Sequence, residues 1–147
     1  MKKFVYRMQG IFELKKKLEE QEKTNYSIAQ AKLRAEEEKL ESLQRRKELY
    51  EERLRQNVGK RLILLEVRQN QDAIETLKLF IRQQAIVVKK AEQNVEVALH
   101  RLQQAIMERK TQEKLRENAF EKYKKEYEAE ERKEIDENVS FQYGATK

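Results

Sequence analysis

Apolar side chains in this chain recur at steps of three and four residues in two long stretches, which are separated by a segment around Gly59. The first stretch runs from Ile11 to Leu54 and the second from Ile74 to Ala105. Steps of three and four place side chains on one face of an α-helix. A helical face of this length is usually buried against another helix. The pattern therefore predicts two long helices that pack on each other.

The breaks in the pattern predict where these helices begin and end. Asn57 and Gly59 are residue types favoured just past a helix end, and Asp72 followed by Glu75 is a capping-box pattern at a helix start. We expect a helix over 4–56, a short helical corner over 57–71, a second helix over 72–138 and a frayed tail over 139–147. The predicted fold is all-α, a single long antiparallel two-helix coiled coil, or helical hairpin.

The spacing of the seam, meaning the side chains through which the two helices face each other, is uneven on the first helix. Its steps follow an eleven-residue repeat from Ile11 to Leu33 and a seven-residue repeat from Leu33 to Leu54. An eleven-residue repeat straightens the left-handed supercoil that a seven-residue repeat requires. We therefore expect the twist to relax toward the termini. Counting back from the corner places residue 85 opposite Leu43.

Composition supports long solvated helices. Charged residues make up 41% of the 147 residues, and the chain has three glycines, no proline and no cysteine. Disorder would also explain the charge, but it predicts no periodicity. The net charge of +6 is small beside 33 basic and 27 acidic residues, and the mixed charges do not indicate a nucleic-acid surface. The absence of cysteine fits a reducing compartment, and no apolar run is long enough to cross a bilayer. We expect a cytoplasmic protein.

The residue types that carry catalytic or metal chemistry are sparse or isolated. One histidine and no cysteine leave no plausible zinc site, and the three glycines stand alone, without a phosphate-binding loop. A two-helix rod also offers no pocket in which catalytic groups could be held. We expect no enzyme activity, no metal and no cofactor. His100 lies between two seam positions and should point outward as an exposed side chain rather than act as a pH switch.

Apolar side chains gather near both ends of the chain. The N-terminal group consists of Phe4, Met8, Ile11 and Phe12. It could insert into a membrane, but a continuation of the seam or a partner-docking surface is the favoured interpretation. Phe120, Tyr123 and Tyr127 continue the helical spacing of the second helix toward the same tip. Because the first helix runs out there, we expect part of this aromatic face to be uncovered.

Three runs in the C-terminal part carry a family resemblance: Glu113–Glu117, Tyr123–Glu126 and Glu131–Val139. The most specific piece is Lys133–Glu137, because a coiled-coil pattern does not require it. With the N-terminal pattern that starts at Phe4, these runs resemble the FliJ family of the bacterial flagellar type III export apparatus, over nearly the whole chain. The resemblance implies an antiparallel coiled coil similar to the central stalk of rotary ATPases.

The resemblance also implies a function, that of a non-enzymatic coupling stalk. The tip built from both termini would enter the pore of the hexameric export ATPase, FliI, promote ring assembly and couple ATP hydrolysis to export. The part near the corner would contact the cytoplasmic region of the export gate protein FlhA, and family members also handle unloaded export chaperones. The implied location is the cytoplasm, peripheral to the inner face of the cell membrane at the flagellar base, without direct membrane insertion.

Carried over residue by residue, the resemblance implies two partner surfaces. The ATPase-facing tip comprises Phe4, Arg7, Met8, Ile11, Tyr123, Tyr127, Ile135, Asp136 and Glu137. The gate-facing patch comprises Leu43, Tyr50, Leu77, Phe80 and Gln84. The chain departs from the family pattern at Ala73, where relatives carry an aromatic residue.

Two other interpretations stay open at this point. A generic cytoplasmic coiled-coil adaptor or export chaperone, with no ATPase ring as partner, would show the same periodicity. A peripheral membrane-remodelling helix would concentrate lysine and arginine on its polar face. Glutamate is instead interspersed along this chain, as in Glu36–Lys39, which disfavours the membrane interpretation.

Overall fold

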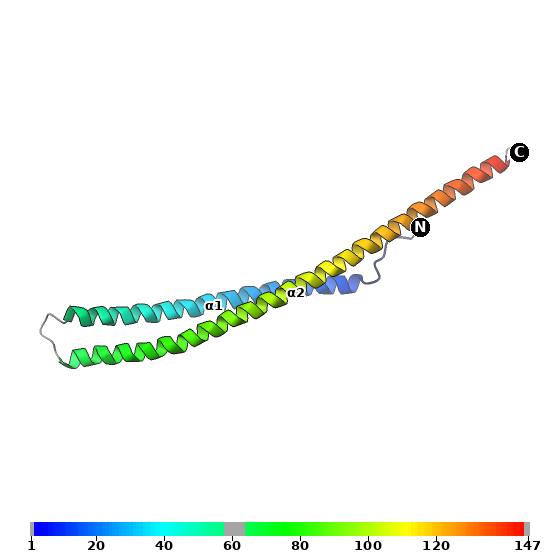
Figure 1. Ribbon diagram of the computed structural model, residues 1–147. Coiled ribbons are helices and arrows are strands. Elements are labelled where there is room, and N and C mark those ends of the chain that lie inside the picture. The colour runs from blue at the N-terminus through cyan, green and yellow to red at the C-terminus, as the bar shows by residue number, and fades with distance from the viewer. Residues whose placement is uncertain (1, 58–63, 146–147) are drawn as a thin grey trace. The chain divides into compact units, whose positions relative to one another are not determined.

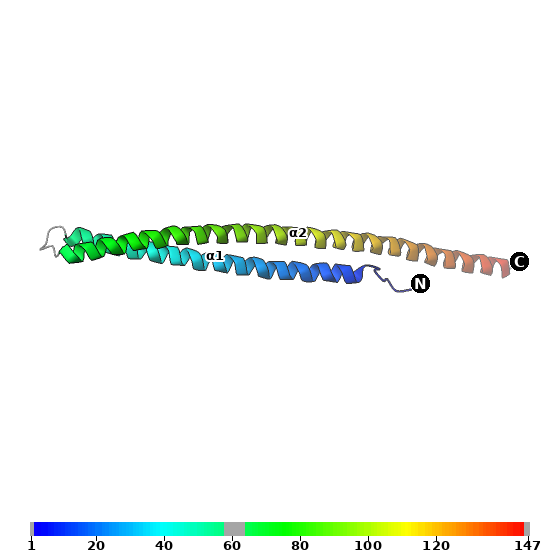
Figure 2. The same ribbon diagram turned by 90° about the horizontal axis from the view of Figure 1, so that it is seen from below.

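The computed structural model describes residues 2–57 and 64–145, and these residues form two long helices and no strand (Figure 1). Helix α1 spans Gln9–Asn57 and helix α2 spans Leu64–Ala145. Glutamate, lysine, leucine, arginine and glutamine dominate both helices, and all are strong helix formers. Because α1 and α2 pack against each other side by side (Figure 2), the predicted all-α helical hairpin is confirmed.

The contacts divide the chain into two compact units. The central unit covers residues 22–102 and pairs the second part of α1 with the first part of α2. The terminal unit covers the residues up to Gln21 and from Gln103 onward. The core of the central unit consists of Ile74, Leu77, Val88 and Ala91, and that of the terminal unit of Phe12 and Ala105. That the whole chain folds as a single domain stays a prediction.

The seam of α2 follows the predicted pattern. Every predicted position from Ile74 to Ala105 is buried or half-buried, and His100 is exposed, as expected. The steps alternate strictly between three and four residues, which is the seven-residue repeat of a left-handed coiled coil. The predicted seam positions of α2 and the predicted exposure of His100 are therefore confirmed.

The seam of α1 differs from the predicted one near its start. Ile11 and Leu14 are exposed, and the covered side chains include Phe12, Glu19 and Tyr26, at seven-residue intervals. The predicted eleven-residue repeat is therefore wrong, and with it the reason to expect a relaxed twist. Apolar residues alone misplace the seam here because a buried glutamate occupies one of its positions.

Helix α1 begins at Gln9 rather than at Phe4. The first helical bond is donated by the backbone amide of Phe12 to the carbonyl oxygen of Met8, at 3.0 Å. Residues 2–8, which we name the N-terminal strap, contain no Ser, Thr, Asp or Asn that could cap an earlier start. Their exposure alternates, with Phe4 and Tyr6 half-buried between exposed neighbours. An alternation with period two is typical of an extended segment.

The predicted corner and tail are also wrong in part. Residues 64–71 belong to α2, because Leu64–Val67 are compatible with a helix and nothing breaks it before Asp72. Residues 58–63 of the predicted corner lie outside the described residues. Residues 139–145 continue α2 rather than fray, since Gly144 costs a helix only about 1 kcal/mol and no proline is present.

The early start of α2 changes the pairing in the central unit. The side-chain amide of Gln84 donates to the backbone carbonyl of Glu36 at 2.9 Å and to its carboxylate at 2.6 Å. The predicted register placed residue 85 opposite Leu43, two helical turns away. Because α2 begins at Leu64 and not at Asp72, the pairing near the turn moves by about the same two turns.

Candidate interaction surfaces

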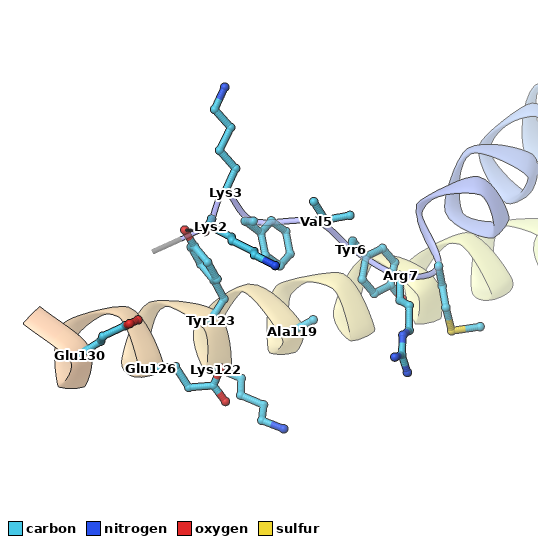
Figure 3. Close-up of a pocket in the computed structure, with 12 residues that line it drawn as sticks. Lys2, Lys3, Val5, Tyr6, Arg7, Ala119, Lys122, Tyr123, Glu126 and Glu130 are labelled. Carbon is cyan, nitrogen blue, oxygen red and sulfur yellow. Dashed lines mark hydrogen bonds between the residues drawn. The ribbon is translucent and has the colours of Figure 1, made fainter.

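The N-terminal strap lies along α2 in the terminal unit and is anchored there by aromatic side chains (Figure 3). The ring of Phe4 lies 5.2 Å from that of Phe120, with the planes at 79°, and 5.4 Å from that of Tyr123. Edge-to-face contacts at these distances are favourable. The hydroxyl of Tyr123 also donates to the backbone carbonyl of Lys2 at 2.8 Å. The strap therefore takes the place of α1 over this part of α2.

A groove of about 920 Å³ lies between the strap and α2. Its strap side carries the basic side chains Lys2, Lys3 and Arg7, and its α2 side carries Lys122, Glu126 and Glu130 (Figure 3). Aromatic and aliphatic side chains cover the rest of its wall. The groove thus offers an apolar floor with charges of both signs at its edge, which suits a protein surface rather than a small reacting molecule.

The structure brings four of the predicted tip residues together. Phe4, Arg7, Met8 and Tyr123 line the groove. Tyr127 contacts the ring of Tyr123 at 6.2 Å, and the remaining tip residues, Ile11, Ile135, Asp136 and Glu137, are exposed and do not line it. That any of these residues contacts an ATPase stays a prediction.

The pKa of the Tyr127 hydroxyl is raised. The largest cause is its hydrogen bond to the carboxylate of Glu131, whose negative charge acts in the same direction. A hydroxyl that donates to a carboxylate holds its proton more firmly. The Tyr127 hydroxyl therefore keeps its proton and remains a hydrogen-bond donor on the surface of α2.

A charged cluster in the seam of the terminal unit was missed by sequence reasoning. The guanidinium of Arg109 donates to Glu19 and to Glu113, each at 2.7 Å, and Lys15 pairs with Glu108 at 3.0 Å. The carboxylates of Glu19 and Glu113 raise the pKa of Arg109. The spacing in the sequence could have revealed this cluster, because Glu19 lies seven residues after Phe12 and therefore on the same face of α1. A buried carboxylate is tolerated when it is paired in this way.

Replacing Arg109 with leucine should lower the unfolding temperature, because the buried Glu19 then loses its ion pair with Arg109 while its charge remains. Restoring neutrality with Glu19→Gln in the same chain should recover part of the loss. The measurement is thermal unfolding by circular dichroism of both single variants and the double variant. Strictly additive effects in this double-mutant cycle would show that the two side chains are not coupled.

Replacing Phe4 with alanine should loosen the strap without unfolding the helices, because Phe4 contributes the ring contacts that hold the strap and is not part of the helix core. The expected result is faster tryptic cleavage after Arg7, with the helical circular dichroism unchanged. Val5→Ala is the matched control, since the Val5 side chain is 82% exposed. Equal cleavage of the two variants would rule out Phe4 as the anchor.

The gate-facing patch lies in the central unit and consists mostly of seam residues. Leu77 is 7% exposed, Leu43 and Tyr50 are half-buried, and Gln84 donates both its bonds to Glu36. The bond from Gln84 is the main cause that lowers the pKa of the Glu36 carboxyl. Phe80, at 47% exposed, is the patch residue whose side chain is most available to a partner.

Over the described ranges, 2–57 and 64–145, no group of three or more His, Asp or Glu side chains could hold a metal ion. In the same ranges, neither helix contains a stretch that is apolar and long enough to span a bilayer.

The chain was compared with known protein families, with curated proteins and with solved structures. The sequence model of the family described as "Flagellar FliJ protein" matches residues 3–147. No curated protein and no solved structure matches the chain. The family match covers both units and all residues of the two candidate surfaces.

Proposed function

The chain belongs to the FliJ family and is therefore a component of the flagellar protein export apparatus, and we propose that it is a non-enzymatic stalk that couples the export ATPase to the membrane export gate. The proposed partners are the hexameric ATPase FliI, at the end that carries both termini, and the cytoplasmic region of FlhA, at the central unit. The proposed location is the cytoplasmic side of the membrane at the flagellar base. Unloaded export chaperones are further proposed partners.

The observation that carries this proposal is the last part of α2. From Lys124 to Gly144 every residue of the helix is exposed, so it continues past the strap as a single helix. A single helix with its side chains is about 10–12 Å wide, which is slender enough to enter the central pore of a ring. The exposed Ile135, and the charged residues on either side of it, belong to the run that resembles the family most specifically.

The strap adds a second segment to the same region. It holds Phe4 against Phe120 and Tyr123, and its basic side chains Lys2, Lys3 and Arg7 line the same groove as Glu126 and Glu130 of α2. A partner that encloses this region would meet both a strap and a helix. This supports a binding surface made by both termini, as the family resemblance implies.

Phe80 is the residue through which we propose that the central unit engages the gate. Its neighbours in the predicted patch are occupied in the seam, so they would support its position rather than contact a partner directly. Because Ala73 provides no aromatic ring beside it, Phe80 would provide most of the apolar contact area.

The test is ATP hydrolysis by the cognate flagellar ATPase with the full-length chain added in stoichiometric steps. We expect stimulation that saturates near one chain per ATPase hexamer. Circular dichroism on the same sample establishes that the chain is helical. A folded chain that leaves hydrolysis unchanged at every ratio would contradict the stalk and favour an adaptor or chaperone without a ring partner.

A further inference from the structure

Helix α2 carries a second apolar face in the central unit, on the side that does not pack on α1. This outer face consists of Leu79, Phe80, Ile86 and Val87, all of which are exposed, with Ile86 at 71%. The two pairs are seven residues apart, so they lie on one side of the helix. The seam positions 77, 81, 84 and 88 are covered by contrast. Four large apolar side chains in water along two helical turns indicate a surface that meets something other than water.

The charge of this stretch is one-sided, unlike that of the chain as a whole. Between Glu75 and Glu92 the sequence contains no carboxylate, and it contains four basic residues. One of them, Lys78, pairs with Glu75 at 3.2 Å. The other three, Arg82, Lys89 and Lys90, are exposed on the same stretch of helix. The outer face is thus apolar and locally basic.

We infer that the outer face of α2 docks on the surface of an anionic lipid bilayer. Helices that lie in a membrane interface combine aromatic and aliphatic side chains with lysine and arginine. The apolar side chains would enter the boundary between headgroups and acyl chains, and Phe80 would then contact the export gate only when the chain has left the bilayer. The basic side chains would reach the lipid phosphates, while their methylene stems cover apolar surface.

The spacing of polar residues favours a bilayer over a partner helix. A second helix would need apolar side chains at the positions between the two pairs and beyond them, as in any seven-residue seam. Those positions are Gln83 and Lys90, which would interrupt such a seam. A bilayer interface accommodates both, because it is polar at the depth their end groups reach. A second copy is disfavoured because it would bring two basic faces together.

The test is co-sedimentation of the full-length chain with sucrose-loaded vesicles. One set contains phosphatidylcholine with phosphatidylglycerol, and the other contains phosphatidylcholine alone. We expect binding to the anionic vesicles, weakening at high salt, and little binding to the neutral ones. The triple variant Arg82→Gln, Lys89→Gln, Lys90→Gln should bind the anionic vesicles more than about tenfold more weakly, since each basic side chain contributes roughly a fivefold factor.

Two matched controls distinguish binding through this face from the effects of total charge and of exposed apolar residues elsewhere. Lys32→Gln, Arg45→Gln, Arg46→Gln removes the same three charges from exposed positions of α1, and this variant should bind as the wild type does. Ile86→Asp should weaken binding, whereas Leu49→Asp, at an exposed position of α1, should not. These apolar positions are exposed, so none of the variants removes a core contact.

Three outcomes would overturn the inference. They are equal weakening by the two triple variants, no binding of the wild type to anionic vesicles, and self-association of the wild type that the outer-face variants abolish. The last would mean that a second copy covers the face. The assay contains only the chain and lipid, so its failure would leave the proposed coupling to the ATPase untouched.

Discussion

Removal of residues 124–147 should abolish stimulation of the export ATPase while leaving the rest of the chain folded. The described part of this segment, Lys124–Gly144, provides no buried or half-buried side chain. Its loss therefore removes little packing energy, and the Phe4 contacts with Phe120 and Tyr123 remain. The measurement is ATPase activity against added chain, together with the unfolding midpoint. Normal, saturating stimulation by the shortened chain would show that the end of α2 is not the ATPase-facing element.

A pair of substitution variants tests whether stimulation of the ATPase depends on the specific residues of this segment or only on its charge. The first variant, Ile135→Ser, Asp136→Asn, Glu137→Gln, changes the run that most resembles the family. Its control, Ala129→Ser, Glu121→Gln, Glu128→Gln, also removes two negative charges and introduces a serine, at exposed positions earlier in the helix that do not line the groove. We expect the first variant to lose most stimulation and the control to retain it. Equal losses would mean that the ATPase senses only net charge.

The sequence predicts the buried face of α2 in the central unit well, although not its register with α1, because that face is built from apolar residues. Leu77, Val88 and Ala91 are both the apolar positions of the pattern and the buried positions of the structure. A seven-residue repeat of such residues has few alternative ways to be buried. Helix type, partner face and antiparallel pairing follow from it directly.

The terminal unit is less predictable because its seam contains paired charges. Any hydrophobicity pattern treats Glu19 as a solvated residue, whereas its ion pair with Arg109 helps to explain its burial. That contact joins residues 90 positions apart in the sequence. Because Ile11 and Leu14 are apolar, the pattern assigns the seam to their face of α1, although both side chains are exposed.

The strap shows how two periodicities can compete over a short segment. Phe4, Met8 and Ile11 are spaced by four and three residues, which fits a helix, whereas Phe4 and Tyr6 with their exposed neighbours fit an extended segment. Over so few residues neither pattern decides. The aromatic rings on α2 that hold Phe4 determine the outcome, and they lie more than 100 residues away in the chain.

The roles of the surface residues could be predicted only by resemblance. Phe80 illustrates the reason, because its exposure shows that it is available but not which partner covers it. Seam residues have their partner within the chain, and therefore their positions can be derived from packing. Residues of the tip and of the gate-facing patch have their partners elsewhere, so the sequence alone carries no physical constraint that identifies them.

Replacing Val88 with aspartate should unfold the central unit at a much lower temperature than the wild type, whereas the same substitution at Val87 should have little effect. Val88 is 8% exposed in the seam and Val87 is 42% exposed on the outer face. An uncompensated charge in the seam costs about 3 kcal/mol or more, which corresponds to roughly a 10 °C drop in the unfolding midpoint. An exposed aspartate destabilises the helix only slightly, through its low helix propensity.

The neighbouring positions make this comparison a sharp test of the seam. Both variants carry the same new charge in the same helix, one residue apart, so net charge and helix propensity change equally. Thermal unfolding followed by circular dichroism at 222 nm, a wavelength that reports helix, measures the difference. If the two midpoints fell together, or if Val87→Asp were the more damaging, then α2 would present a different face to α1 from the one described here. A large gap in the predicted direction would instead tie the stability of the central unit to the alternating three- and four-residue steps from which its fold was first deduced.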